Sequence, residues 1–446
     1  MKAASFRIGT GAGFSADRLD PAVDLARRGD LDAIVFECLG ERTLASGLLD
    51  KRSDSALGYN RLLETRMRAV LPLCRAGNTC LITNMGAANP LAAGKVVVDV
   101  ARELGLQGLR VAVVTGDDAT HLLDKDTHLI EPNCALNDFE PHMIGANAYL
   151  GTEGIVAALK QKANVVITGR VADPSLFLAP LQHFFQWEYD DWARVGAGTM
   201  IGHVMECAAQ VTGGYFADPG YKNVEELAFV GFPIAEVQHN GTAVITKLPD
   251  TGGCVDPRTV KEQLLYEIHD PAHYLTPDVT ADFSSARVDS AGKDRVSISG
   301  AHGRERPQEL KVTVAFAGGF VGEAEISYAG PGAQRRARMA GEIVAERLSQ
   351  VHGVQTTPRL DLIGVSSLHG TAGQTTTDSQ DVRLRCAMRT PARKEAETLL
   401  WEVESLLCCG PAGGGGYRGY VRPSILTYST LIDRGRISPI LDVFDV

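Results

Sequence analysis

Short runs of apolar residues alternate with amphipathic stretches through the first half of the chain. Five of these runs are rich in β-branched residues and end in a glycine, an asparagine or a charged residue, which is typical of buried strands. They cover residues 5–9, 32–38, 79–84, 110–116 and 164–169. Four stretches between them carry apolar residues three or four positions apart, which predicts helices. They cover residues 17–29, 59–77, 90–105 and 147–163.

This alternation predicts βαβ units that build a mostly parallel sheet flanked by helices. In an open α/β sheet, ligands bind where the carboxyl ends of the strands meet. All five predicted strands lead into polar or glycine-rich sequence at that end. We therefore expect one polar cleft along this edge of the sheet.

The pattern changes near residue 235. From there, apolar and polar residues alternate singly between Gly, Asn and Asp turns, which favours an antiparallel or mixed sheet. Such strands are expected within 236–253, 278–303 and 309–330, before a helix over 333–350 and a final α/β portion over 359–433. The prediction is an α/β parallel-sheet domain over residues 1–235 and a mixed α+β domain with a glycine-rich loop over residues 236–446.

Composition narrows the class of protein. The chain has 446 residues, of which 44% are hydrophobic and 22% charged, so it can bury a full core. No apolar run reaches the roughly 18 to 20 residues needed to cross a bilayer, and the first residues lack the pattern of a signal peptide. We therefore expect a cytoplasmic protein. The net charge of -10 argues against a general nucleic-acid or anionic-membrane surface.

Two further patterns bear on cofactors. The nine cysteines include no C-x-x-C pair, and no two-histidine zinc helix is present, so we predict no metal. The glycine-rich turn over residues 7–18 follows a strand and precedes a helix, where a phosphate can bind. It departs from the dinucleotide pattern at Phe14, where a third glycine is expected. We therefore predict no redox cofactor.

The strongest candidates for catalysis lie within residues 198–221. On one helix, His203, Glu206 and Gln210 would share a face, with Gln210 predicted to bind substrate. The apolar neighbours of Glu206 predict poor solvation, which raises the pKa of a carboxyl toward the range useful for general acid or base catalysis. The adjacent Cys207 is either a nucleophile or, more commonly for such a thiol, an inert buried side chain.

Polar residues follow the predicted second and third strands. Glu41 and Arg42 follow the second strand and are expected to bind substrate, with a solvated loop as the alternative. Asn84 and Asn89 surround a turn after the third strand, where their amides can hold a carbonyl oxygen. The alternative is that the two asparagines only cap turns.

Residues 167–180 place Arg170 and Asp173 after the fifth predicted strand. The planar guanidinium of Arg170 suits a carboxylate or phosphate, because it binds both through two hydrogen bonds. Asp173 is a third candidate for catalysis, and capping of the following helix is its structural alternative.

The segment over residues 408–423 contains four consecutive glycines, beginning at Gly413. Glycines of this kind serve close backbone approach to a ligand or to another chain segment. Gly413, Gly414, Gly415 and Arg418 are therefore predicted to bind substrate in a loop that closes over the cleft. A flexible surface loop is the alternative.

Six motifs stand in order along the chain: FECLGERTLA, ITNMGAANP, ITGRVADPSL, GHVMECAAQVTGG, LPDTGG and GPAGGGGYRGYVRPSILTYSTLIDR. With them the chain resembles the acyclic terpene utilisation protein A family over roughly residues 5 to 435. The resemblance implies a cytoplasmic catabolic protein that handles branched acyl-CoA intermediates beside biotin-dependent acyl-CoA carboxylases. Some members carry a small extra C-terminal domain. This chain ends at Val446 without one, which leaves open whether a separate small subunit supplies it.

The residues and the resemblance together predict an enzyme that acts on a branched acyl-CoA or carboxylate intermediate, of the hydratase or lyase type. The substrate is then a CoA thioester or a free carboxylate, and no cofactor is expected. The alternative is a non-catalytic binding or assembly subunit that partners an acyl-CoA pathway enzyme. We expect a homo-oligomer that binds neither nucleic acid nor a membrane.

Overall fold

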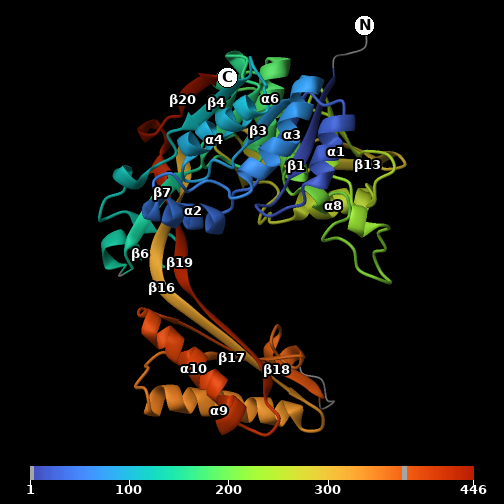
Figure 1. The fold of residues 1–446 in the computed structure, drawn as a ribbon. Helices are drawn as coiled ribbons and strands as arrows, with labels where there is room; N and C mark the ends of the chain where they lie inside the picture. The colour runs from blue at the N-terminus through green and yellow to red at the C-terminus, as the bar shows by residue number, and fades with distance from the viewer. Residues whose placement is uncertain (1–4, 140, 374–378) are drawn as a thin grey trace. The chain divides into compact units, whose positions relative to one another are not determined.

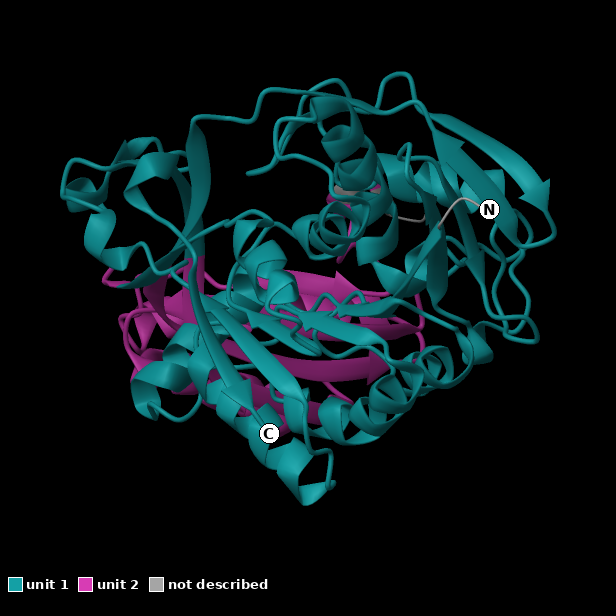
Figure 2. Ribbon diagram, turned by 90° about the horizontal axis from the view of Figure 1, so that it is seen from above, with its two compact units in different colours: residues 1–139, 144–314, 427–446 teal, residues 140–143, 315–426 magenta. Residues whose placement is uncertain are grey.

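The computed structural model describes residues 5–139, 141–373 and 379–446. The chain forms two compact units, which Figure 2 colours separately. Unit 1 contains residues 1–139, 144–314 and 427–446, and unit 2 contains residues 140–143 and 315–426. The expected boundary near residue 235 does not coincide with this division.

Five parallel strands form the centre of a ten-stranded sheet in unit 1, in the order β1-β2-β3-β8-β4. They are β1 (Ser5–Ala12), β2 (Ala33–Phe36), β3 (Cys80–Thr83), β4 (Arg110–Thr115) and β8 (Val165–Thr168). Each lies within or overlaps one of the five predicted runs, so the predicted parallel sheet is confirmed. These strands are buried along most of their length, which explains their continuous β-branched sequence.

Antiparallel strands extend both edges of this parallel centre. On the side of β1 follow β9 (Pro233–Gln238), β10 (Ala243–Lys247), β14 (Arg295–Ser299) and β13 (Arg287–Gly292). On the other side, β20 (Ile440–Asp445) pairs with β4. The alternating second-half strands therefore complete the first sheet, because pairing with β9 satisfies the open edge of β1. The α/β fold class with a mixed second half is confirmed.

Helices cover both faces of the sheet (Figure 1). The chain moves outward from β3 to β4 and then returns to β8, so right-handed crossovers place α4 and α5 on opposite faces. On the side of α4, neighbouring helices α1 and α3 bury their apolar residues in one core. The helices of unit 1 are α1 (Asp20–Arg28), α2 (Glu41–Ser53), α3 (Leu63–Gly77), α4 (Pro90–Glu103), α5 (Glu153–Lys160), α6 (Ser175–Phe185), α7 (Trp192–Glu206) and α8 (Pro257–Leu265).

One predicted helix was too long. The stretch 147–163 forms a helix only from Glu153, because its first residues complete strand β7 (Met143–Ala148). The short strands of unit 1 are β5 (His128–Leu129), β6 (Cys134–Ala135), β11 (Tyr274–Leu275), β12 (Thr280–Asp282) and β15 (His302–Arg304). Within the part of the chain that the structure describes, no helix combines the length and apolar character required to cross a bilayer.

Unit 2 has the element order β-α-β-β-α-β. The elements are β16 (Glu309–Ala329), α9 (Ala333–Gln350), β17 (Arg359–Ile363), β18 (Asp381–Thr390), α10 (Arg393–Cys409) and β19 (Gly415–Asp433). The strands lie in the order β17-β18-β16-β19, and β18 runs antiparallel to both neighbours. This is the ferredoxin-like arrangement. Both helices pack on the sheet around a core of their own, and the predicted helix over 333–350 is confirmed as α9.

Candidate active site

The carboxyl ends of β2, β3 and β8 bring polar side chains together at one edge of the unit 1 sheet. Glu37 follows β2 and Asn84 follows β3. The amide nitrogen of Asn84 donates to Oε1 of Glu37 at 2.9 Å, and its oxygen accepts from the N–H of Cys38 at 2.7 Å. Asn84 is fully buried. Its amide nitrogen and oxygen therefore both stabilise the position of the chain after β2.

Arg170 lies at the centre of this network and is only 1% exposed. Nε and Nη2 donate to the carbonyl oxygen of Val171 at 2.8 and 2.6 Å, and Nη1 donates to that of Leu39. Nη2 also forms an ion pair with Asp173. The guanidinium lies 4.3 Å from the ring centre of Tyr149. Arg170 was predicted to bind a ligand anion, but its N–H groups donate hydrogen bonds within the protein itself.

A cavity of about 540 Å³ opens beside this network within unit 1. Its lining residues are Ile130, Glu131, Tyr149, Ala172, Asp173, Pro174, Tyr274, Leu275, Thr276, Pro277, Pro307, Gln308, Glu309, Leu310, Lys311, Ser429 and Leu431. Most of this lining is apolar. The Asp173 side chain, 34% exposed, faces solvent from its ion pair with Arg170. It makes no capping hydrogen bond to the N-terminus of α6.

A second polar group borders the same cavity. The N–H of Tyr149 donates to the carbonyl oxygen of Lys311 at 2.9 Å, which sets the two residues side by side. The Tyr149 hydroxyl donates to Glu41 at 2.5 Å, and the Lys311 ammonium lies 3.1 Å from the same carboxylate oxygen. Burial alone would raise the pKa of Glu41, but these hydrogen bonds lower it to about 2. Glu41 is therefore an ionised partner that holds Lys311.

Carboxyl groups crowd around Arg170. Burial and the charge of Asp173 raise the pKa of Glu37 to about 8. Burial also raises the pKa of Asp173, and Arg170 opposes the rise. The pKa of Glu206 lies well above its ordinary value because of burial and then Asp173. Burial therefore raises the pKa of all three carboxyl groups, and the charge of Asp173 raises it further in Glu37 and Glu206.

His203 and Glu206 occupy the last turn of α7, with Nδ1 of His203 3.1 Å from Oε1 of Glu206. Burial lowers the pKa of His203 to about 4, so the imidazole is neutral when the Glu206 carboxyl is protonated. The remaining atoms, Nε2 and Oε2, have no hydrogen-bond partner among the described residues. The His203 ring lies 5.3 Å from that of Tyr274, which lines the cavity. This pair therefore lies behind the cavity wall.

Gln210 does not continue the face of His203 and Glu206. Helix α7 ends at Glu206, and a short 3-10 turn over Ala208–Gln210 follows, in which Ala208 has a positive φ of 45°. The glycine-rich turn after β1 packs here: a Cβ on Gly13 would lie 2.3 Å from the carbonyl carbon of Cys207. Burial raises the pKa of the Cys207 thiol, which makes it a poor nucleophile.

Other predicted binding residues have structural roles. Asn89 caps α4 by accepting from the N–H of Ala92 at 3.4 Å, and its amide donates to the carbonyl oxygens of Ser55 and Leu57. This is the capping alternative. The segment that carries Arg42 is not a loop, because α2 begins one residue earlier, and Arg42 is exposed.

The glycine-rich segment over 408–423 lies in unit 2 and is mostly strand, since β19 begins at Gly415. The short remaining turn approaches its own unit: Arg336 donates to the carbonyl oxygen of Ala412 at 2.8 Å, and a Cβ on Gly414 would meet Tyr328. Arg418 is exposed. A ligand role for Gly413, Gly414, Gly415 and Arg418 stays a prediction.

Three cavity residues could not be recognised from the sequence. Tyr149 fell within a predicted helix, and Lys311 and Tyr274 lay in the alternating second half. The Lys311–Glu41 contact joins positions 270 residues apart, so no local pattern marks it. Lys311 takes an exposed position in the alternation of β16, as Glu309 does, so no signal in the sequence set it apart.

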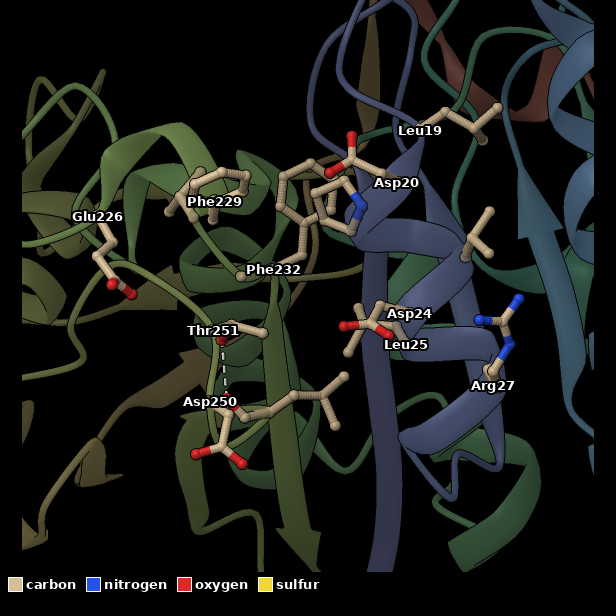
Figure 3. Close-up of a pocket in the computed structure, with 15 residues that line it drawn as sticks. Leu19, Asp20, Asp24, Leu25, Arg27, Glu226, Phe229, Phe232, Asp250 and Thr251 are labelled. Atoms are coloured by element: carbon tan, nitrogen blue, oxygen red, sulfur yellow. Dashed lines mark hydrogen bonds between the residues drawn. The ribbon is translucent and has the colours of Figure 1, made fainter.

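A larger cavity of about 860 Å³ lies between α1 and the segments 226–232 and 248–251. Figure 3 shows Asp20 and Asp24 on α1 and Glu226 and Asp250 on the facing segments. All but the half-buried Asp24 are exposed. None of the predicted site residues lines this cavity, so the candidate site is the smaller one beside Asp173.

These features define an α/β protein with a buried carboxyl cluster next to an apolar cavity, at the carboxyl edge of a mostly parallel sheet. The model of the family described as acyclic terpene utilisation family protein AtuA matches residues 6–443. The chain therefore belongs to this family, and membership supports a role in acyclic terpene utilisation. No curated protein and no solved structure matches the chain.

Proposed function

We propose that the protein is an enzyme of acyclic terpene breakdown that adds water to, or removes it from, a branched acyl-CoA or carboxylate intermediate. The observation that carries this proposal is the position of Asp173. Its carboxyl, whose pKa is raised, lies on the wall of an apolar cavity while it is paired with the buried Arg170. A carboxyl whose pKa is raised in this way can exchange a proton with a bound substrate.

The cavity suits such a substrate. Its volume of about 540 Å³ lies in the range of small-molecule sites, and its apolar lining would bury a branched hydrocarbon chain. Lys311, with 46% of its side chain exposed, can hold a carboxylate or a polarised carbonyl oxygen. Arg170 and Asn84 are less suited to that role, because their polar atoms bind within the protein.

The carboxyl cluster supplies the proton. Hydration of a carbon–carbon double bond adds a proton to one carbon and a hydroxyl group to the other, and elimination reverses both steps. In the proposed reaction Asp173 exchanges the proton at the substrate. Glu206 lies behind the same cavity wall with its pKa raised by burial, and in this proposal it supports the proton exchange at Asp173. Neutral His203 orients Glu206 through their 3.1 Å contact.

The test uses Glu206→Gln, which keeps the shape of the side chain and removes its proton. The protein is incubated with CoA esters and free acids of branched unsaturated compounds, and mass spectrometry follows the gain or loss of one water. We expect turnover to fall by about 10²-fold while binding, read from thermal shifts, survives. Glu188→Gln removes an exposed carboxylate and should leave both unchanged.

Two results would contradict the proposal. Binding without turnover by the unaltered protein would favour a non-catalytic binding or assembly subunit. If no ester or acid changes the melting temperature, both the enzymatic and the binding hypothesis are wrong. The expected homo-oligomer and separate small subunit are proposals that size-exclusion chromatography can examine alongside.

A further inference from the structure

The charged side chains that line the cavity beside Asp173 are mostly acidic. They are Glu131, Asp173, Glu309 and Lys311. Asp173 is balanced by its ion pair with the buried Arg170. Glu131 and Glu309 are exposed, and neither forms an ion pair with a residue that the structure describes. The unbalanced charge of this lining is therefore negative.

Lys311 is the only cation among the described residues of this lining, and its charge is already balanced. Its ammonium lies 3.1 Å from the carboxylate of Glu41, which is ionised with a pKa of about 2. It also lies 4.9 Å from the centre of the Tyr149 ring. Burial opposes the charged form of Lys311, but Tyr149 and Glu41 raise its pKa overall. A ligand carboxylate would therefore compete with Glu41 for this cation.

Two further acidic side chains act on the same end of the cavity. Oε2 of Glu131 accepts from the N–H of Ser429 at 2.7 Å. Burial opposes ionisation of Glu131, but this bond and the charge of Lys311 lower its pKa. Glu309 lies two residues before Lys311 on β16, so the two side chains point to the same side of the strand. A ligand anion here would meet three acidic side chains and one ammonium.

This balance of charge favours a neutral ligand group. Like charges at short range oppose the binding of an anion, and an apolar lining removes part of the water that would solvate it. An uncharged carbonyl oxygen avoids both costs. It can still accept a hydrogen bond from Lys311, because an ammonium has three donor hydrogens and the bond to Glu41 uses one.

We infer that the group bound beside Lys311 is the uncharged ester or thioester carbonyl of a branched acyl chain, and that this cavity discriminates against the free carboxylate. The inference rests on the proposed function, because it concerns the substrate of the same cavity. It selects the acyl thioester from the two substrate classes that the proposal contains.

Calorimetry with geranic acid and its methyl ester tests the inference, because the two compounds share one branched hydrocarbon chain and differ in charge. We expect the ester to bind about tenfold more tightly than the acid, or better. Added salt should strengthen binding of the acid and leave binding of the ester unchanged, because salt screens the repulsion.

Variants test whether the acidic side chains cause this preference. Glu131→Gln combined with Glu309→Gln removes two like charges and should reduce the preference for the ester by about threefold or more. Glu305→Gln removes an exposed carboxylate outside the lining and should leave the preference unchanged. The melting temperature of each variant checks that it is folded.

Three binding results would overturn the inference. They are equal or tighter binding of the acid, an unchanged preference in the folded double variant, and binding of neither compound. Mass spectrometry follows turnover of the acid and of its CoA ester separately. Preference for the ester without turnover supports the inference and contradicts the proposed reaction. Turnover of the acid as fast as that of the CoA ester overturns the inference and leaves the proposed reaction standing.

Discussion

Two buried arginines, Arg170 and Arg66, differ in the groups that balance their charge. Arg170 has an ion pair with Asp173 and three hydrogen bonds to carbonyl oxygens. Arg66 forms no ion pair with any residue that the structure describes. Because leaving a buried charge unpaired is costly, loss of Asp173 should affect folding as well as proton transfer, whereas loss of the Arg66 charge should not. Variants at these positions therefore require stability measurements beside any activity assay.

Glu37 predicts a pH dependence of stability at the residue scale. Its pKa is about 8 in the folded protein and about 4.5 when unfolded, so between these values the folded state holds a proton that the unfolded state has released. The free energy of unfolding should therefore fall by up to a few kcal/mol as pH rises from about 5 to about 8. Glu37→Gln keeps the oxygen that accepts from Asn84 and Leu39.

Urea unfolding at both pH values checks this expectation. The slope between them should be shallower in Glu37→Gln than in the unaltered protein. Equal slopes would show that Glu37 is ionised at neutral pH, contrary to its raised pKa.

At the scale of elements, the β1 turn and the end of α7 depend on each other. Gly13 leaves room for the backbone of Cys207, and the Thr10 hydroxyl donates to the carbonyl oxygen of Met205 at 2.9 Å. These contacts hold the turn of α7 that carries Glu206. Gly13 in the glycine-rich sequence after β1 therefore serves the packing of this turn against the end of α7.

Gly13→Ala should push the end of α7 away from β1. The added methyl would overlap the Cys207 backbone, so we expect the free energy of unfolding to fall by about 1 to 3 kcal/mol and proton transfer to weaken. Denaturant unfolding and the turnover assay measure the two effects. Gly415→Ala adds the same methyl where no atom lies within 4 Å and should leave the free energy of unfolding nearly unchanged. A stable, active Gly13→Ala would show that α7 tolerates the shift.

At the scale of the whole molecule, the two units have separate cores. All residues of the unit 2 core lie between Ala324 and Leu406, within one continuous stretch of chain. We therefore expect residues 315–426 to fold alone and to unfold cooperatively on heating, as circular dichroism and NMR spectra would show. The fragment 236–446, cut at the boundary expected from the sequence, should aggregate because the cut falls within β9 and removes its partner β1. A soluble, folded 236–446 would contradict this division of the chain.

Much of the fold could be predicted from the sequence, and less of the site. The strand over Val165–Thr168 is marked by its apolar run, and α9 by its apolar spacing. The early end of α7 could not be predicted, because it lies against Gly13. Gly13 and Cys207 are 194 residues apart in the sequence but adjacent in space. Candidate residues such as Asp173 were found because parallel strands align their carboxyl ends.

By itself, the sequence determined the parallel centre of the sheet, the family, and the strand ends at which polar groups gather. These follow from local periodicity and from motifs, both of which are properties of neighbouring residues. Only the tertiary structure decided that β9 pairs with β1. It also decided that Arg170 binds the Leu39 carbonyl oxygen and Asp173, and that Lys311 forms an ion pair with Glu41. The physical reason is that strand pairing, burial and the pKa of a carboxyl depend on which distant segments pack together, and alternation along a strand does not specify its partner.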